Sequence, residues 1–134
     1  MPGRNYEPEH NQEFYRLLDA VLHEPEKVRH IVAERPMILE ECNLTGETVL
    51  HWLAVENHID GIRLLRRLGA TIPDYALVHA AELGNTEAVV VLLELGADLR
   101  GWDVERTLCN PVFGLSKEKK RLIRSYVAQY SDHT

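Results

Sequence analysis

The sequence predicts an all-α fold built from helix pairs that stack side by side. Glycine, proline and asparagine divide the chain into segments of about ten residues, and within each segment apolar residues recur three and four positions apart, as on one helix face. The segments at 58–70 and 85–97, HIDGIRLLRRLGA and NTEAVVVLLELGA, match at their double leucine and closing Gly-Ala. Because such repeats are typical of stacked units, we expect a helix-turn-helix solenoid of about four pairs.

The N-terminal pair contains two helices that are divided at a proline. From Asn11, the run EFYRLLDAVL places its apolar residues on one face. Pro25 suits the first turn of the second helix, and Pro36 ends that helix because Arg35 before it is pushed out of the helical region. We expect the segment Met37–Leu39 to be a buried apolar connection to the next pair.

The two central pairs end at Gly69 and Gly96, since glycine suits the left-handed conformation that follows a helix. Their helices are predicted at 47–56 and 59–68 in one pair, and at 74–83 and 86–95 in the next. In the last pair a short helix precedes Pro111, and Ser116 caps the long helix KEKKRLIRSYVAQY. No segment alternates apolar and polar residues, so we expect almost no sheet.

We predict a single domain made of successive repeats. The chain has 134 residues, of which 45% are hydrophobic, and this is enough for one core. Lysines and arginines at 117–124 give the last repeat the polar outer face that a terminal repeat requires. The predicted parts are a tail at 1–13, an N-terminal capping repeat at 14–42, repeats at 43–71 and 72–100, and a C-terminal capping repeat at 101–134.

Composition restricts the partners and the compartment. The formal net charge of -6 repels nucleic-acid phosphates and anionic membrane surfaces alike. The longest apolar run, 88–93, is too short to span a membrane, and the first ten residues lack the apolar core of a secretory signal. Cys42 and Cys109 are expected to be free, behaving as small hydrophobic residues, in a reducing cytoplasm. We expect a cytoplasmic protein that is monomeric when free and has no cofactor.

The first central repeat carries a motif. In GETVLHWLAVENHIDGIRLLRRLGA, a glycine and a threonine precede a Leu-His pair, and a turn separates a first helix from a second with paired leucines and a closing Gly-Ala. This pattern resembles the ankyrin repeat, and the resemblance covers roughly residues 14 to 127. The matching residues are Gly46, Thr48, Leu50, His51, Ala54, His58, Leu64, Leu65, Gly69 and Ala70.

Departures from the family pattern are also present. Val49 replaces the usual proline, and Asn57 replaces a glycine with positive φ, for which asparagine is the best substitute. The next repeat has Tyr75 and Val78 in place of threonine and histidine. Its entry segment TIPDY is about six residues shorter than in the family. We therefore expect a truncated β-hairpin finger between the two central repeats.

The resemblance implies a non-catalytic protein–protein interaction module that binds its partner on a concave face made of inner helices and fingers. Several predicted contacts, such as Glu47 and Glu82, are acidic, and the arginines fall mainly on outer helices, which favours a partner with a basic surface. A sharper hypothesis is an inhibitor or immunity-type protein for a basic toxin or enzyme. The contact positions implied are Leu44, Thr45, Glu47, Val55, Glu56, Asp74, Glu82, Leu83, Trp102, Val104 and Glu105.

Glu40 and Glu41 extend this acidic character, since no lysine or arginine occurs between residues 38 and 58, and Asp103 continues it with Glu105 in the last predicted finger. Trp52 is expected in the core. Trp102 fits a partner contact and a cover for the last repeat equally well, and the same alternatives are open for Tyr75.

Two other functions stay open at this point. The basic C-terminal helix is a candidate nucleic-acid contact, although only Tyr126 and Tyr130 offer aromatic rings beside its cations. A small metal-binding protein or enzyme would use histidine and cysteine, but a predicted helix end separates His51 from His58, and no histidine lies near Cys109 in the sequence. We therefore expect no metal site and no catalysis. The cations concerned are Lys117, Lys119, Lys120, Arg121 and Arg124.

Histidines of the motif have structural roles in the ankyrin family. The resemblance implies that His51 bonds across neighbouring turns and that His58 caps or bridges at the start of the second helix. His23 and His30 are separated in the same way by the break at Pro25, and we expect no site there either.

Overall fold

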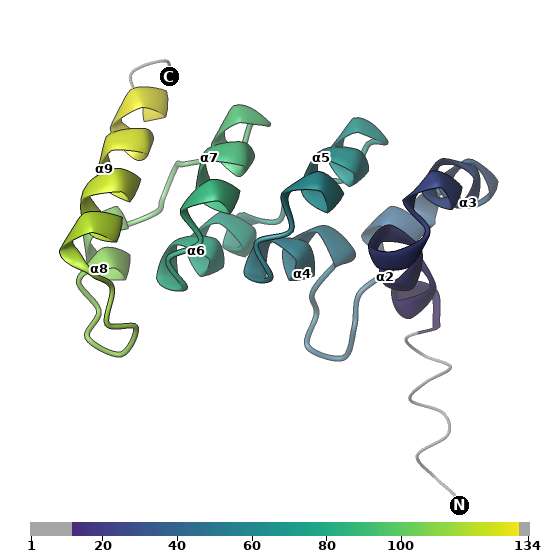
Figure 1. The fold of residues 1–134 in the computed structure, drawn as a ribbon, viewed down its shortest axis with the longest axis horizontal. Coiled ribbons are helices and arrows are strands. Elements are labelled where there is room, and N and C mark those ends of the chain that lie inside the picture. Colours follow the sequence, from purple (N-terminus) through teal and green to yellow (C-terminus); the bar gives the residue numbers. More distant parts are fainter. Residues whose placement is uncertain (1–11, 132–134) are drawn as a thin grey trace, which may run out of the picture.

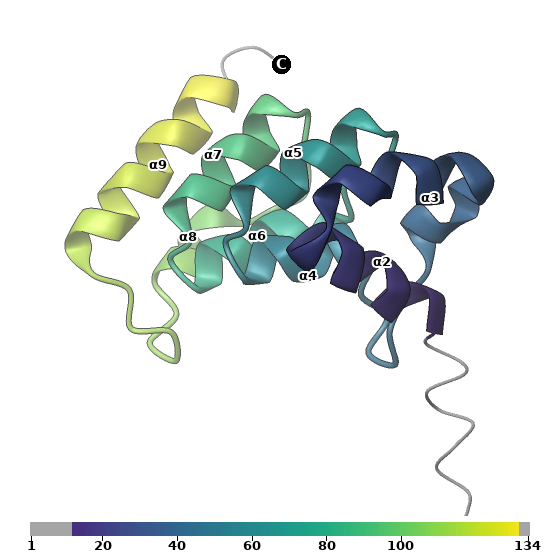
Figure 2. The same cartoon turned by 45° about the vertical axis from the view of Figure 1, so that its right-hand side comes forward.

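The computed structural model describes residues 12–131, and its helices form successive pairs that stand in a row (Figure 1). The helices are α2 (Gln12–His23), α3 (Val28–Glu34), α4 (Val49–Val55), α5 (Ile59–Arg67), α6 (Asp74–Glu82), α7 (Thr86–Glu94), α8 (Val104–Leu108) and α9 (Lys117–Ser131). Figure 2 shows α4, α6 and α8 in one layer, with α5, α7 and α9 in the other. Within each layer neighbouring helices pack on one another, α4 on α6 and α6 on α8, α5 on α7 and α7 on α9.

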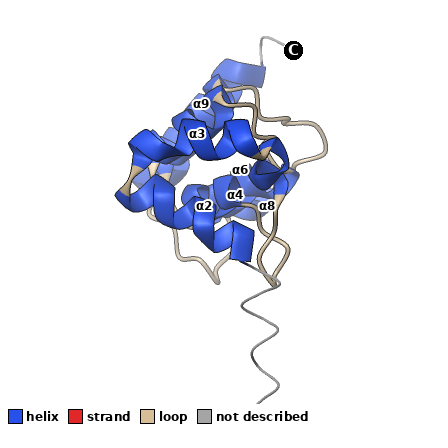
Figure 3. Ribbon diagram, turned by 90° about the vertical axis from the view of Figure 1, so that its right-hand side faces the viewer, coloured by secondary structure: helices blue, strands red, loops and turns tan. Residues whose placement is uncertain are grey.

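The described residues contain helices and loops but no strand, as the view along the row also shows (Figure 3). One isolated antiparallel bridge joins Cys42 and Thr48 at the base of the loop before α4. The prediction of an all-α fold is therefore confirmed for this part of the chain. None of these helices has both the length and the apolar character of a membrane span.

The predicted helix pairs occur where the apolar periodicity placed them. Helix α2 begins at Gln12, so the predicted tail at 1–13 lies outside the described residues apart from its last two positions. Pro25 starts a short 3-10 helix, Pro25–Lys27, that leads into α3. At the C-terminal end Lys119 N donates to Ser116 Oγ over 3.2 Å, which confirms the predicted cap of α9.

The connection between the first two pairs is only partly buried. Pro36–Glu40 forms a second 3-10 helix in which Ile38 and Leu39 are buried but Met37 is 67% exposed. The prediction that all of Met37–Leu39 is buried is therefore wrong. A 3-10 helix has three residues per turn, so three consecutive side chains point in three different directions and one of them faces water.

The core runs between the two layers from one end of the row to the other. The double leucines that defined the repeat contribute to it, since Leu65 and Leu92 are fully buried. Trp52 is half-buried and packs against this core, in line with its predicted place. Helix α6 lies between α4 and α8, and its Ala76 and Ala80 are fully buried, which lets these helices lie close together.

Loops project from the row before α4 and between α8 and α9, whereas the connection from α5 to α6 is short and does not project (Figure 1). The truncated finger predicted there is therefore present as a short connection. The prediction that Val104 and Glu105 belong to a finger loop in the last repeat is wrong, because both residues lie in α8. Asp103 Oδ1 accepts from Arg106 N over 3.1 Å, and this cap starts the helix at Val104.

Candidate functional site

A hollow of about 430 Å³ lies where α6 and α8 begin. Two of its residues are aromatic: Tyr75 in the first turn of α6 is 66% exposed, and Trp102 just before α8 is half-buried. The lining residues are Asp74, Tyr75, Leu77, Val78, Asp98, Arg100, Gly101, Trp102, Asp103, Arg106 and Thr107. Of the predicted contact residues, the hollow therefore brings together Asp74 and Trp102.

The two walls of the hollow are positioned by local sequence. Helix α6 starts directly after Pro73, and the short connection from α5 leaves its first turn uncovered, so the ring of Tyr75 faces water. Trp102 is held on the other wall, where its indole Nε1 donates to Thr107 Oγ1 over 2.8 Å. Because the indole also packs against the core, Trp102 both covers the last repeat and lines the hollow.

Only part of the acidic charge in the hollow is available to a ligand. Arg100 surrounds Asp98, donating from Nε over 3.0 Å, from Nη2 over 2.9 Å and from its backbone N over 2.9 Å. The side-chain bond from Arg100 is the main cause that lowers the pKa of Asp98 to about 2. Asp103 serves as the cap of α8. The carboxylate of Asp74 has no ion-pair partner among the described residues, and it is the acidic group that the hollow offers.

The predicted acidic face is partly neutralised by arginines from elsewhere in the chain. Glu41 pairs with Arg35 over 2.8 Å, and Glu105 pairs with Arg124 over 2.7 Å. Hydrogen bonds from Arg124 are the main cause that lowers the pKa of Glu105. The expectation that no lysine or arginine faces the acids at 38–58 is therefore wrong for Glu41, because its partner Arg35 lies just before that segment.

Other predicted contacts are held within the protein or lie apart from the hollow. Thr45 Oγ1 donates to Asn43 Oδ1 over 2.9 Å, and Glu40 Oε2 accepts from the backbone N of Thr71 over 3.0 Å. Leu44 and Leu83 are exposed and free to meet a partner. The predicted contacts outside the lining of the hollow are Leu44, Thr45, Glu47, Val55, Glu56, Glu82, Leu83, Val104 and Glu105.

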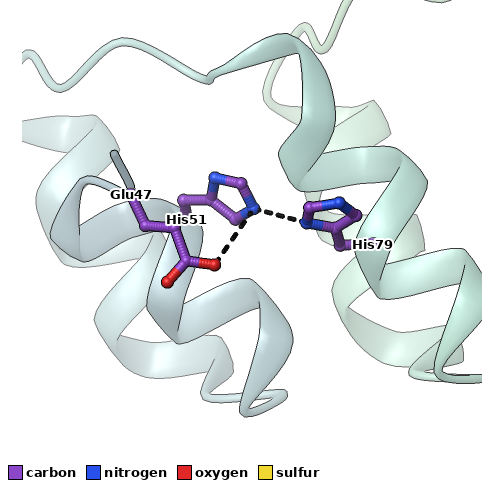
Figure 4. Close-up of side chains that lie close together, drawn as sticks. All are labelled: Glu47, His51 and His79. Carbon is purple, nitrogen blue, oxygen red and sulfur yellow. Dashed lines mark hydrogen bonds and ion pairs between the residues drawn. The ribbon is translucent and has the colours of Figure 1, made fainter. Parts of the chain in front are cut away.

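A second cluster joins the loop before α4, α4 itself and α6. His51 Nε2 and His79 Nδ1 lie 2.8 Å apart and share a hydrogen bond, and Glu47 Oε2 lies 4.0 Å from the same His51 nitrogen (Figure 4). His51 is only 6% exposed. Burial is the main cause that lowers the pKa of His51; His79 lowers this pKa further, and Glu47 opposes the shift.

The pairing of His51 with His79 was missed from the sequence, which compared His51 only with His58. In the internal repeat, position 85 corresponds to position 58. By the same offset, Val78 corresponds to His51, and Val78 directly precedes His79. That offset is the signal that could have found the pair. The expected role of His58 is confirmed, since its Nδ1 accepts from Gly61 N over 3.0 Å at the start of α5.

Two further predictions concern the basic helix and the thiols. In α9, Arg121 pairs with Glu118 and Arg124 pairs with Glu105, so two of the cations proposed for a nucleic-acid contact are neutralised within the protein.

Cys42 and Cys109 are free, as expected, but both are exposed rather than packed as small hydrophobic residues. Both lie outside the helices, Cys42 in the loop before α4 and Cys109 directly after α8.

Comparison of the chain with protein-family models, with curated proteins and with solved structures gives no match.

Proposed function

We propose that the chain is a non-catalytic protein–protein interaction module of the ankyrin type, which takes a lysine or arginine side chain of its partner into the hollow between α6 and α8. One observation carries the proposal: an exposed aromatic ring, Tyr75, stands in one hollow with the carboxylate of Asp74 and the indole of Trp102. A cation is attracted both to an aromatic face and to a carboxylate, and the three aspartates of the lining outnumber its two arginines, Arg100 and Arg106, which also favours a basic side chain.

The lining of the hollow supports binding rather than catalysis. Among the described residues that line it there is no histidine or cysteine, and the hydroxyl of Thr107 is already engaged by Trp102. An activated nucleophile needs a base within hydrogen-bond distance, and among these residues no carboxylate bonds to the hydroxyl of Thr107, which contacts the indole of Trp102 and the backbone oxygen of Asp103. Its walls belong to packed helices, so that binding would order little of the protein and more of the interaction energy would remain as affinity.

The charge of the whole chain supports a basic partner. The formal net charge of -6 attracts a basic surface over distances of about a Debye length, ~8 Å in physiological salt. Such attraction raises the association rate more than it lowers the dissociation rate, so binding should weaken as salt increases. A basic enzyme or toxin that is neutralised by this protein is a particular form of the proposal.

The experiment is capture of partners from the lysate of the source cells, followed by measurement of Kd for the partner recovered. We compare the unchanged protein with Asp74→Lys and Tyr75→Ala. The matched control is Asp60→Lys, because Asp60 is also an exposed acid in the first turn of a helix, α5, but does not line the hollow. The charge change is the same in both lysine variants.

We expect Asp74→Lys and Tyr75→Ala each to weaken binding at least about tenfold, and Asp60→Lys to leave Kd within about twofold of the unchanged protein. Contact of the partner with another surface would appear as a Kd that the two hollow variants do not change. Equal weakening by Asp60→Lys and Asp74→Lys would mean that net charge, and not the hollow, selects the partner.

A further inference from the structure

We propose that Glu47, His51 and His79 form a binding site for a divalent transition-metal cation, with Zn²⁺ as the cation that fits best. The candidate ligand atoms are one carboxylate oxygen of Glu47 and one ring nitrogen of each histidine, and these atoms all lie within 4.8 Å of one another. Figure 4 shows the two rings and the carboxylate turned toward a common point between α4 and α6. None of the three ligands lines the hollow between α6 and α8, although Tyr75 of the hollow stacks on His79.

The chemistry of the three donors matches zinc. Two imidazole nitrogens and one carboxylate oxygen are a known set for Zn²⁺, with water as the fourth ligand. Mg²⁺ and Ca²⁺ prefer sites made of oxygen atoms, so this mixture of nitrogen and oxygen discriminates against them. His51 is buried and His79 is half-buried, so the walls of the site are protein rather than open solvent.

The observed distances are close to those that a bound cation requires. Two ligands at about 2.0–2.1 Å from Zn²⁺ in tetrahedral geometry are about 3.3 Å apart. His51 Nε2 lies 2.8 Å from His79 Nδ1 and 4.0 Å from Glu47 Oε2, one distance shorter and one longer than this value. The third pair, Glu47 and His79, lies within 4.8 Å, so a bound cation would replace the hydrogen bond between the rings and draw the carboxylate closer by on the order of 1 Å.

Each ligand is held by a second group. Oε1 of Glu47 accepts from Asn43 Nδ2 over 3.2 Å, and this contact leaves Oε2 of the same carboxylate directed at His51. The ring of Tyr75 stacks on His79 with centroids 5.9 Å apart. The backbone N of His51 donates to the capping Thr48 Oγ1 over 3.3 Å. The contacts on the side chains of Glu47 and His79 are of the kind that orients metal ligands and contributes to metal affinity.

Two other histidines in the described part of the chain provide a control. His23 lies 3.8 Å from Asp19, and His30 lies 3.4 Å from Glu34, each pair one helical turn apart on an exposed surface. Neither pair has a third ligand within the same 4.8 Å, since one such group of three was found among the described residues. They offer imidazole and carboxylate without the proposed arrangement.

The test is calorimetric titration of ZnCl2 into protein freed of metal with a chelator, with MgCl2 as the comparison salt. We expect one Zn²⁺ per chain and no comparable heat with Mg²⁺. His79→Gln should weaken Zn²⁺ binding at least about tenfold, and Asn43→Ala should weaken it by a smaller factor through Glu47. The double variant His23→Gln/His30→Gln should bind Zn²⁺ as the unchanged protein does.

Unchanged Zn²⁺ affinity in His79→Gln would overturn the proposal, and so would the absence of stoichiometric binding by the unchanged protein. Because His51 is buried, His51→Gln is used only after circular dichroism shows native helix content. A second readout is the thermal midpoint, which should rise with ZnCl2 in the unchanged protein but not in His79→Gln, since a cation bound only by the folded state stabilises it. Asp74→Lys should retain Zn²⁺ binding, which separates this proposal from that of the hollow.

Discussion

Asn57 and Asn85 exchange helix caps between neighbouring helix pairs. Asn57, at the end of α4, accepts at Oδ1 from the backbone N of Ala88 in the first turn of α7, over 3.0 Å. Asn85, at the start of α7, donates from Nδ2 to the carbonyl oxygens of Ala54 over 3.2 Å and Val55 over 2.8 Å, at the end of α4. Each asparagine thus satisfies backbone groups that a helix end leaves without intrahelical partners, and the caps link one pair to the next.

Two substitutions of Asn57 should distinguish the contribution of its side-chain cap from the strain of its left-handed backbone. Asn57 has a φ of 57°, in the left-handed region, so glycine would keep the backbone and lose only the side-chain bonds. We expect Asn57→Gly to lower the free energy of unfolding by about 1 kcal/mol, the typical net contribution of a hydrogen bond, because the bond from Ala88 N is lost. Asn57→Ala should lose about 1 kcal/mol more, because alanine is strained at positive φ. Urea denaturation measures both values.

Equal stability of Asn57→Gly and the unchanged protein would show that the cap on α7 contributes nothing. If Asn57→Ala and Asn57→Gly unfold at the same urea concentration, the backbone at this position is not strained.

Gly61 should resist a substitution that usually stabilises helices. It lies in α5, where alanine is favoured over glycine by about 1 kcal/mol when the position is exposed. A Cβ atom at this position would lie 2.7 Å from His58 Nδ1 and 2.9 Å from side-chain carbons of Leu53 and Val21. We expect the crowding to outweigh the propensity, and Gly61→Ala to lower the thermal midpoint. A raised midpoint would show that these three side chains move aside without cost.

Much of the fold could be predicted because its signals are local. The three and four spacing of apolar residues placed the helices of the central pairs within about two residues, which is the margin by which helix ends ordinarily vary. Asn57 with positive φ, His58 at the start of α5 and Ser116 at the start of α9 were all identified from their neighbours in sequence. Each of these features depends on a few consecutive residues, and a single sequence contains that information.

The candidate sites could be predicted only in part, because they depend on contacts between separate elements. Periodicity determines which face of a helix is buried, but not which side chains of the next helix lie opposite. The bond between His51 and His79 and the ion pair of Glu105 with Arg124 are both contacts of this kind. The exposure of Tyr75 likewise follows from the short connection before α6, and the sequence left its role open.

Arg100 should control the charge of Asp98 in the wall of the hollow. The pKa of Asp98 is lowered to about 2, first by the side-chain bond from Arg100 and then by the backbone bond from the same residue. A lowered pKa favours the folded state above the ordinary value of 3.8, and this stabilisation is lost as the pH falls from there toward about 2. Arg100→Ala should raise the pKa toward its ordinary value without fully restoring it, because the backbone bond remains.

A carbon-detected NMR titration of the Asp98 carboxyl between pH 1.5 and pH 6, roughly the range in which aspartates titrate, measures this shift. The control is Arg106→Ala, which removes another cation that lines the hollow but does not bond to Asp98. An unchanged midpoint in Arg100→Ala would show that the ion pair does not persist in solution.

Alanine substitutions at Gly84 and Gly46 should distinguish the cost of backbone strain from the cost of steric crowding. Both have positive φ, +71° and +83° respectively, so alanine should cost about 1 kcal/mol at either position from the left-handed backbone alone. A Cβ atom on Gly46 would meet nothing within 4 Å, whereas one on Gly84 would lie 2.9 Å from Lys119 Cδ and 3.1 Å from Leu115 Cδ2. Lys119 is flexible and can move aside, but Leu115 packs against the core.

We therefore expect Gly84→Ala to destabilise the protein more than Gly46→Ala, and Gly84→Val to lose more than ~1 kcal/mol, because a β-branched side chain fits positive φ poorly. Urea denaturation of the three variants gives the comparison. If Gly84→Ala and Gly46→Ala lose the same free energy of unfolding, the contact between the added methyl group and Leu115 costs nothing.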